Sequence, residues 1–162
     1  MMILKTTYKH PDYLPTMKNM KILILSAVSL LTLLLPSCNK MEAKGDVSFA
    51  KSTFESLVRG DSAVAEKIDW ETLTSLGISV GGQYVAFKEE LDRTNFRKGF
   101  ITQFSASFRE SGASVASFTN WRVVTHDKTH TEVAADSTSG QLHLTVSERD
   151  GIERLSAIEI AK

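Results

Sequence analysis

Residues 120–160 read NWRVVTHDKTHTEVAADSTSGQLHLTVSERDGIERLSAIEI and contain four segments in which apolar and polar residues alternate. These segments cover residues 120–126, 130–136, 141–147 and 152–160. The sequences STSG and RDG, rich in turn-forming residues, precede the third and fourth segments. The pattern predicts a meander of four antiparallel strands with one apolar face.

Pairing His126 with His130 and Asp136 with Gln141 sorts the first three strands into two faces. The inner face then holds Trp121, Val123, Thr125, Thr131, Val133, Ala135, Leu142, Leu144 and Val146, without an acid or a histidine. The outer face holds Arg122, Val124, His126, His130, Glu132, Asp136, Gln141, His143 and Thr145. The sequence does not determine which residues of the fourth strand face inward. A three-residue turn before it would place Ile152, Ile158 and Ile160 on the inner face. A two- or four-residue turn would place Leu155 and Ala157 there instead.

Helical periodicity precedes the strands. The apolar residues of 47–58 recur at helical spacing after Asp46, a plausible N-cap, and Gly60 is expected to end this helix. A second helix is expected after Asp61 or Ser62, then a turn over 69–76 with Leu73 and Leu76 inward and a glycine-containing break over 78–84. The strongest helix carries a four-residue phenylalanine repeat with Ile101 beside it, which predicts a core face, with a ligand-stacking wall as the alternative. The repeat consists of Phe96, Phe100, Phe104 and Phe108.

Composition excludes several classes of protein. The 162 residues suit one domain, and 19 basic against 19 acidic residues give no electrostatic reason to expect nucleic acid as a partner. A single Cys cannot form an intrachain disulfide or a cysteine-rich zinc site. Gly81-Gly82 lacks the following Lys-Ser/Thr of a phosphate-binding loop, and no Gly-x-Ser-x-Gly supports a serine nucleophile.

Residues 22–35, ILILSAVSLLTLLL, are uncharged and follow Lys18 and Lys21. Fourteen helical residues span about 21 Å, less than the roughly 30 Å hydrocarbon core of a bilayer. The pattern therefore predicts a signal peptide over residues 1–37, in which 1–16 is interpreted as an over-long start; the alternative is a short uncleaved anchor.

The segment 35–38, Leu-Pro-Ser-Cys, resembles a bacterial lipobox at the end of that apolar run. The resemblance implies that Cys38 carries acyl chains and anchors the protein to a membrane, and two or three chains anchor stably. Asn39 follows where aspartate would mark inner-membrane retention, which favours the outer membrane of the cell envelope. Residues 38–45 would then form a lipidated tether, followed by a domain over 46–162.

The ending ERDGIERLSAIEI (148–160) and the segment FESLVRGD (54–61) resemble the nuclear transport factor two-like (cystatin-like cone) superfamily. The resemblance implies an α+β fold with N-terminal helices packed on a curved four-stranded antiparallel meander, often around a pocket. Members include isomerases, dehydratases, cyclases and non-catalytic binding modules, so the fold alone does not set the activity.

We therefore expect a lipid-anchored, non-catalytic ligand-binding or protein-interaction module. Its pocket is expected to involve Trp70, Tyr84, Phe100, Phe104, Trp121, Val133 and Leu144. The alternative is a small extracytoplasmic isomerase, dehydratase or hydrolase with Asp69 as base and Tyr84 as hydroxyl donor. Neither a cofactor nor a metal is predicted, because His126 and His130 have no easy third ligand. The outer sheet face is a candidate surface for a homodimer or an envelope partner, with plain solvent exposure as the alternative.

Overall fold

The structure is a computed structural model that describes residues 35–161, with side chains from residue 45 onward. The chain divides into two compact units, Met1–Asn39 and Lys40–Lys162, and the fold described below is that of the second. The predicted signal peptide falls almost entirely in residues 1–34, outside the described part, and so does the side chain of Cys38. Lipidation therefore stays a prediction.

The first described helix, α2 (Leu35–Arg59), runs straight through Asp46, so the predicted helix start at Asp46 is wrong. The carboxylate of Asp46 does not cap this helix; it accepts a hydrogen bond from Thr131 across the fold. The helix also includes the residues predicted as a polar tether. Its end is as predicted, because Gly60 adopts the left-handed conformation, with φ of 75°.

Between α2 and the long helix the chain makes short elements. The 3₁₀ helix η1 (Ser62–Lys67) is capped by Asp61, whose carboxylate accepts from the Ala63 amide at 3.0 Å. The strands β1 (Thr74–Ser75) and β2 (Ile78–Ser79) then form a hairpin, followed by α3 (Val80–Tyr84).

The expected turn with Leu76 inward is wrong, and so is the expected break over 78–84. Leu76 and Gly77 both have positive φ, 51° and 78°, which makes them a two-residue hairpin turn. That turn leaves Leu76 56% exposed.

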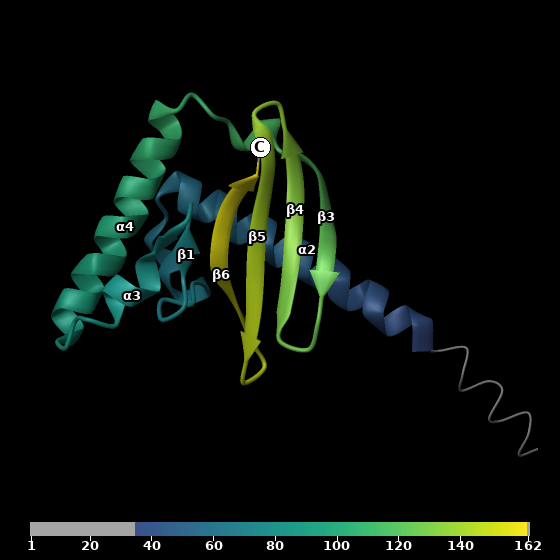
Figure 1. Cartoon of the computed structure of the whole chain (residues 1–162), viewed down its shortest axis with the longest axis horizontal. Coiled ribbons are helices and arrows are strands. Elements are labelled where there is room, and N and C mark those ends of the chain that lie inside the picture. Colours follow the sequence, from purple (N-terminus) through teal and green to yellow (C-terminus); the bar gives the residue numbers. More distant parts are fainter. Residues whose placement is uncertain (1–34, 162) are drawn as a thin grey trace, which may run out of the picture. The chain divides into compact units, whose positions relative to one another are not determined.

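Six strands form one sheet in the order β2-β1-β6-β5-β4-β3 (Figure 1). The four predicted strands are present as β3 (Thr119–His126), β4 (His130–Ser137), β5 (Gly140–Arg149) and β6 (Ile152–Ala161). The predicted count of four is wrong, because β1 adds to β6 in parallel and carries β2 with it. The observed class is α+β with a curved, unclosed sheet.

The strand register is predicted correctly between β4 and β5, where Asp136 pairs with Gln141. Between β3 and β4 a bulge at Val124 shifts the pairing, so His126 lies opposite Thr131 rather than His130. Between β5 and β6 the turn has two residues, Asp150 and Gly151, both with positive φ.

A second bulge, at Ser156 in β6, resolves the open question about the faces of that strand. It brings both Leu155 and Ile158 inward, at 0% and 1% exposure. Each of the two alternatives considered for this strand was therefore half right, because the bulge changes the facing part-way along it.

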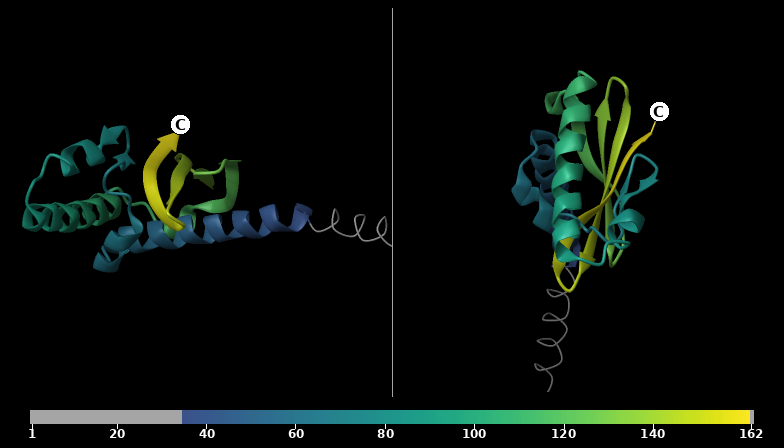
Figure 2. Two further views of the ribbon diagram at one scale, coloured as in Figure 1. Left: turned by 90° about the horizontal axis from the view of Figure 1, so that it is seen from below. Right: turned by 90° about the vertical axis from the view of Figure 1, so that its left-hand side faces the viewer.

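The core lies between the inner face of the sheet and α2. Its most deeply buried side chains include Phe54, Leu57, Leu73, Val133, Leu142, Leu144, Leu155 and Ile158. Figure 2 shows α2 and the long helix α4 (Glu90–Glu110) on the same side of the strands. A 3₁₀ turn, η2 (Val115–Ser117), connects α4 to β3.

The phenylalanine stripe of α4 packs against the core, as predicted, and stays partly exposed. Ile101, expected beside it, is buried together with Ser105. Ser105 Oγ donates a hydrogen bond of 2.7 Å to the carbonyl of Val58 near the end of α2. The predicted helix is therefore confirmed, and the partial exposure of Phe96, Phe100, Phe104 and Phe108 is what the sequence did not predict.

Substitution of Gly81, a buried residue of α3, tests this packing. A Cβ at Gly81 would lie too close to the backbone carbonyl of Glu71. We expect Gly81→Ala to lower the free energy of unfolding by about 1–3 kcal/mol. Gly99→Ala on α4 is the matched control, because a Cβ there meets nothing within 4 Å and should stabilise by about 0.5–1 kcal/mol. Urea unfolding measures both, and equal effects would contradict the packing.

Candidate functional site

An apolar groove of about 580 Å³ lies between α4 and the hairpin and short helix that precede it. One wall comes from α4: Phe96, Gly99, Phe100, Gln103, Phe104 and Ser107. The opposite wall comes from β1, β2 and α3: Ser75, Leu76, Ile78, Val80 and Gln83. Its volume is that of a typical small-molecule site, and most of its lining is hydrocarbon with a few amides and hydroxyls.

The apolar surface continues past the groove toward the end of the sheet. A neighbouring hollow of about 200 Å³ shares Leu76, Phe104 and Ser107 with the groove and extends to Phe108 and Ile160. Leu76, Ile78 and Ile160 are among the exposed large hydrophobic residues. Contiguous exposed apolar surface of this kind marks a site of interaction more often than scattered single side chains do.

Aromatic neighbours hold the phenylalanine wall in place. The ring of Phe100 meets Trp70 edge-on with 5.7 Å between ring centroids, and Phe96 lies 6.1 Å from Tyr84. Phe100 and Phe104 also stack with centroids 6.0 Å apart. Gly99 has no side chain and thereby widens the groove at its middle. The wall is thus a preformed surface rather than a set of loose side chains.

The structure separates the residues that were predicted to form a pocket. Phe100 and Phe104 line the groove, and Trp70 and Tyr84 pack behind it. Val133 and Leu144 are fully buried in the core, and Trp121 packs against Phe54 at the far side. Sequence reasoning missed the second wall, since Leu76-Gly77 was not recognised as a hairpin turn.

Asp69 and Tyr84, the pair considered for catalysis, lie in different surroundings. Asp69 caps the following turn through the Glu71 amide at 3.3 Å and forms an ion pair with Arg149 at 3.6 Å. Tyr84 lies among aromatic rings, with the guanidinium of Arg93 5.5 Å from its ring centroid. Both side chains therefore have structural partners that account for them.

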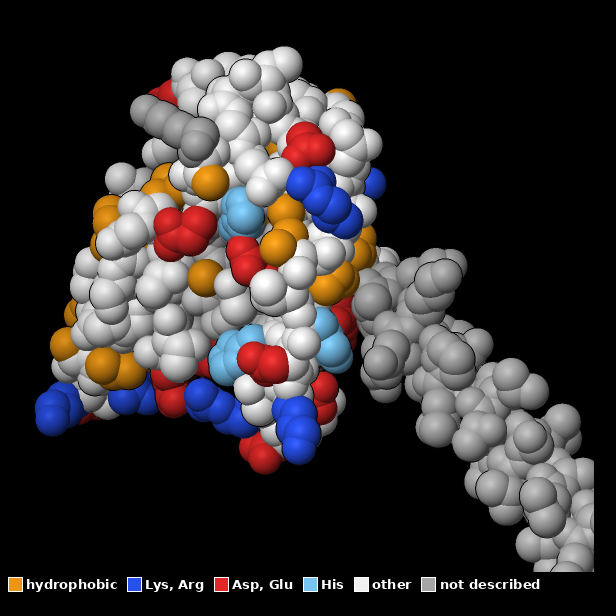
Figure 3. All heavy atoms as spheres, turned by 45° about the vertical axis from the view of Figure 1, so that its right-hand side comes forward, with side chains coloured by type: hydrophobic (Ala, Val, Ile, Leu, Met, Phe, Trp, Pro, Cys, Tyr) orange, Lys and Arg blue, Asp and Glu red, His pale blue; other side chains and the backbone are white. Residues whose placement is uncertain are grey.

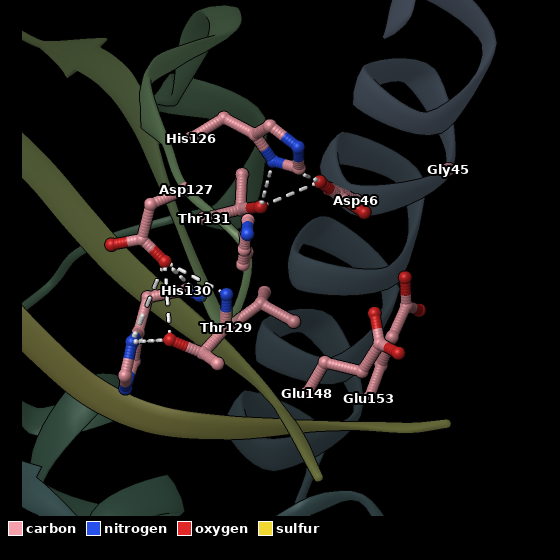
Figure 4. A pocket seen from close by; sticks show the side chains of 11 residues that line it. Gly45, Asp46, His126, Asp127, Thr129, His130, Thr131, Glu148 and Glu153 are labelled. Atoms are coloured by element: carbon pink, nitrogen blue, oxygen red, sulfur yellow. Dashed lines mark hydrogen bonds and ion pairs between the residues drawn. The ribbon is translucent and has the colours of Figure 1, made fainter. Parts of the chain in front are cut away.

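A second, polar hollow of about 380 Å³ lies where α2 meets the β3–β4 and β5–β6 turns (Figure 4). It is lined by Gly45, Asp46, His126, Asp127, Lys128, Thr129, His130, Thr131, Val146, Glu148 and Glu153. Val146 supplies the only large apolar side chain in this lining. The two hollows therefore suit ligands of opposite character.

Three side chains in the polar hollow form a chain of hydrogen bonds. Thr131 Oγ1 donates to Asp46 Oδ2 at 2.7 Å, and His126 Nδ1 lies 2.7 Å from Thr131 Oγ1. His126 Nδ1 also lies 3.5 Å from Asp46 Oδ2. The prediction that the inner face lacks an acid and a histidine is wrong here, because the Val124 bulge turns His126 to the side of Thr131 and α2 supplies Asp46.

Two carboxylates of this hollow have shifted pKa values. Burial, followed by the nearby carboxylates of Asp46 and Glu148, raises the pKa of Glu153. The backbone amides of Thr129 and His130 donate to Asp127 at 2.8 Å each and lower the pKa of its carboxyl. The first effect comes mainly from burial, with neighbouring carboxylates adding to it, and the second stabilises the turn between β3 and β4.

The outer sheet face is mixed in character. His143 Nδ1 and Glu132 Oε1 lie 2.5 Å apart, and Arg122 pairs with Asp136 at 3.1 Å. In Figure 3 single hydrophobic side chains lie between acidic, basic and histidine side chains. Val124 is half-exposed there. A partner surface on this face stays a prediction. Among the side chains that the structure describes, no group of three His, Cys, Asp or Glu residues is arranged to hold a metal ion.

Comparison with protein-family models, with curated proteins and with solved structures finds no match to this chain. The resemblance to the nuclear transport factor two-like superfamily and to bacterial lipoproteins therefore stays a prediction. Within residues 35–161, no helix is both long enough and apolar enough to cross a membrane.

The raised pKa of Glu153 predicts a pH dependence of stability. The folded protein holds this proton at pH values where the unfolded chain, with a pKa near 4.5, has released it. The free energy of unfolding should therefore fall as the pH rises above 4.5 toward the folded-state pKa. Glu153→Gln should flatten this fall, whereas Glu110→Gln at the end of α4 should not. Urea unfolding across pH 4–7 measures this pH dependence. A pH dependence in Glu153→Gln that equals that of the wild type would contradict a raised pKa of Glu153.

Proposed function

We propose that this protein is a lipid-anchored, non-catalytic binding protein of the bacterial cell envelope, whose cone-like domain holds an elongated apolar ligand in the groove along α4. The observation that carries the proposal is the half-buried phenylalanine wall. Phe96, Phe100 and Phe104 pack against the core on one side and line an open groove of about 580 Å³ on the other.

The energetics favour an apolar occupant. Burying a large apolar side chain fully contributes about 1.5–3 kcal/mol relative to leaving it in water. The three phenylalanines of the groove are only partly buried, and Leu76 and Ile78 are exposed. A hydrocarbon ligand would bury more of this apolar surface and gain part of that free energy on binding. The side-chain amides of Gln83 and Gln103 at the groove can orient one polar group of the ligand.

The anchor places this site close to a membrane. Seven residues separate Cys38 from Asp46, which is buried against the sheet, and seven residues reach at most about 25 Å. Acyl chains on Cys38, and an outer-membrane location favoured by Asn39, would hold the groove at the surface that supplies apolar molecules. The element order of helices followed by a meander, on a curved sheet, supports the cone-like assignment.

The outer sheet face, with Val124 half-exposed among ion pairs, serves as the surface for a second copy or an envelope partner. It lies on the opposite side of the strands from the apolar inner face, so a partner there would not cover the inner face.

Filling the groove tests the binding function. Gly99→Leu places a side chain into the groove from a helical position with free space around its Cβ, so the fold should persist. We expect photolabelling of the full chain in membranes by a diazirine-bearing long-chain alcohol to map to α4 and the β1–β2 hairpin. The variant should reduce this labelling roughly tenfold, equivalent to about 1.4 kcal/mol of binding.

Thr102→Leu is the matched control, because Thr102 is an exposed residue of the same helix outside the groove lining. This variant should label like the wild type. Equal labelling of α4 in Gly99→Leu and the wild type, or equal loss in both variants, would contradict a ligand seated in the groove.

The anchor has its own test. Cys38→Ala removes the only thiol of the chain, so the precursor should stay unlipidated and unprocessed by lipoprotein signal peptidase. Mass spectrometry of membrane and soluble fractions measures both the acyl mass and the cleavage site. Processing and acylation at wild-type levels in Cys38→Ala would rule out the lipoprotein assignment, without bearing on the groove.

A further inference from the structure

The polar hollow at α2 contains the arrangement of a proton-accepting histidine. We propose that His126 is a general base at a second site, where it activates water to hydrolyse a small ester that is neutral or positively charged. Asp46 and Thr131 act as positioning residues, because they act on the reaction through His126. This activity is separate from ligand binding in the α4 groove.

The hydrogen bonds determine which nitrogen of His126 carries the proton. Thr131 has one hydroxyl proton and donates it to Asp46 Oδ2 at 2.7 Å. Its oxygen therefore accepts from His126 Nδ1, 2.7 Å away, and Asp46 Oδ2 at 3.5 Å favours the same protonation. Nδ1 is thus the N–H of the neutral ring, and the lone pair of Nε2 is available as a base.

The two positioning residues are buried, whereas the proposed base is partly exposed. Asp46 is 7% exposed and fixed on α2, so the acceptor at the end of the chain has a defined position. Thr131 is also buried, within β4. The His126 side chain is 45% exposed beside an open hollow of about 380 Å³. Among the side chains that the structure describes, Nε2 of His126 forms no hydrogen bond, which leaves it accessible to water and substrate.

The proposed step balances in atoms and charge. His126 Nε2 removes one proton from a water molecule as the water oxygen attacks the ester carbonyl carbon. The carbon–oxygen bond to the alcohol then breaks, and the imidazolium returns its proton to the departing alkoxide. One ester and one water give one carboxylic acid and one alcohol, and His126 ends in its starting neutral form.

The charges around the hollow set the substrate class. Its lining contains four carboxylates, on Asp46, Asp127, Glu148 and Glu153, and one lysine, Lys128. An anionic ester would be repelled, because these four carboxylates outnumber the single lysine of the lining. A neutral or cationic ester meets no such repulsion.

The experiment uses the full chain in lipid nanodiscs and the neutral ester 4-nitrophenyl acetate as probe. We expect His126→Gln to lower kcat/KM at least 100-fold, the range of general-base contributions. Free imidazole also cleaves this ester, so loss of any accessible histidine could lower the rate, and a histidine outside the hollow is needed as the control. His143→Gln on the outer sheet face is this matched control and should keep wild-type activity. Equal rates in the wild type and His126→Gln would overturn the proposal.

Variants of Thr131 test its positioning role. Thr131→Val keeps the shape but loses the hydroxyl that donates to buried Asp46, so it should lower the melting temperature and, at a temperature where it is folded, lower kcat/KM at least tenfold. Thr131→Ser should restore activity. Wild-type activity in Thr131→Val would exclude a role for the hydrogen-bond chain through Thr131. Imidazole ¹⁵N NMR of the wild type needs no variant: the neutral His126 ring should carry its proton on Nδ1, and a proton on Nε2 would contradict the inference.

Discussion

The contact between Ser105 on α4 and the carbonyl of Val58 on α2 determines how the domain is built around its groove. This buried hydrogen bond and the neighbouring Ile101 hold α4 by its side of smaller residues. The neighbouring phenylalanines pack against the core through Phe54 and Trp70, and the exposed sides of Phe96, Phe100 and Phe104 line the groove opposite the β1–β2 hairpin. The groove therefore depends on how the α2 contact orients α4.

Two β-bulges apply a similar constraint within the sheet. Each adds one residue to a strand and reverses the facing of the residues beyond it. The bulge at Ser156 lets Leu155 and Ile158 both enter the core, and the bulge at Val124 brings His126 beside Thr131 and Asp46. The polar hollow thus depends on a single inserted residue in β3.

The sequence predicted those features that depend on local pattern: the four long strands, the β4–β5 register, a cap at Asp61 or Ser62, and the phenylalanine-bearing helix α4. It failed where a tertiary contact chooses between local alternatives. Nothing in the phenylalanine repeat shows that Ile101 and Ser105 are the buried side, and alternation along a strand cannot locate a bulge. The β1–β2 hairpin was missed because Leu76, a residue that rarely adopts positive φ, occupies the first position of its turn.

The account as a whole requires that the phenylalanine wall of α4 is open to an apolar ligand while the core behind it is closed. Fluorine NMR of the full chain with 4-fluorophenylalanine at each of its eight phenylalanines measures this directly. Addition of a long-chain alcohol should shift the resonances of Phe96, Phe100 and Phe104 and leave Phe49 on α2, which lines neither apolar hollow, unchanged. Unchanged resonances for the three groove residues, or a shift of Phe49 equal to theirs, would contradict the account.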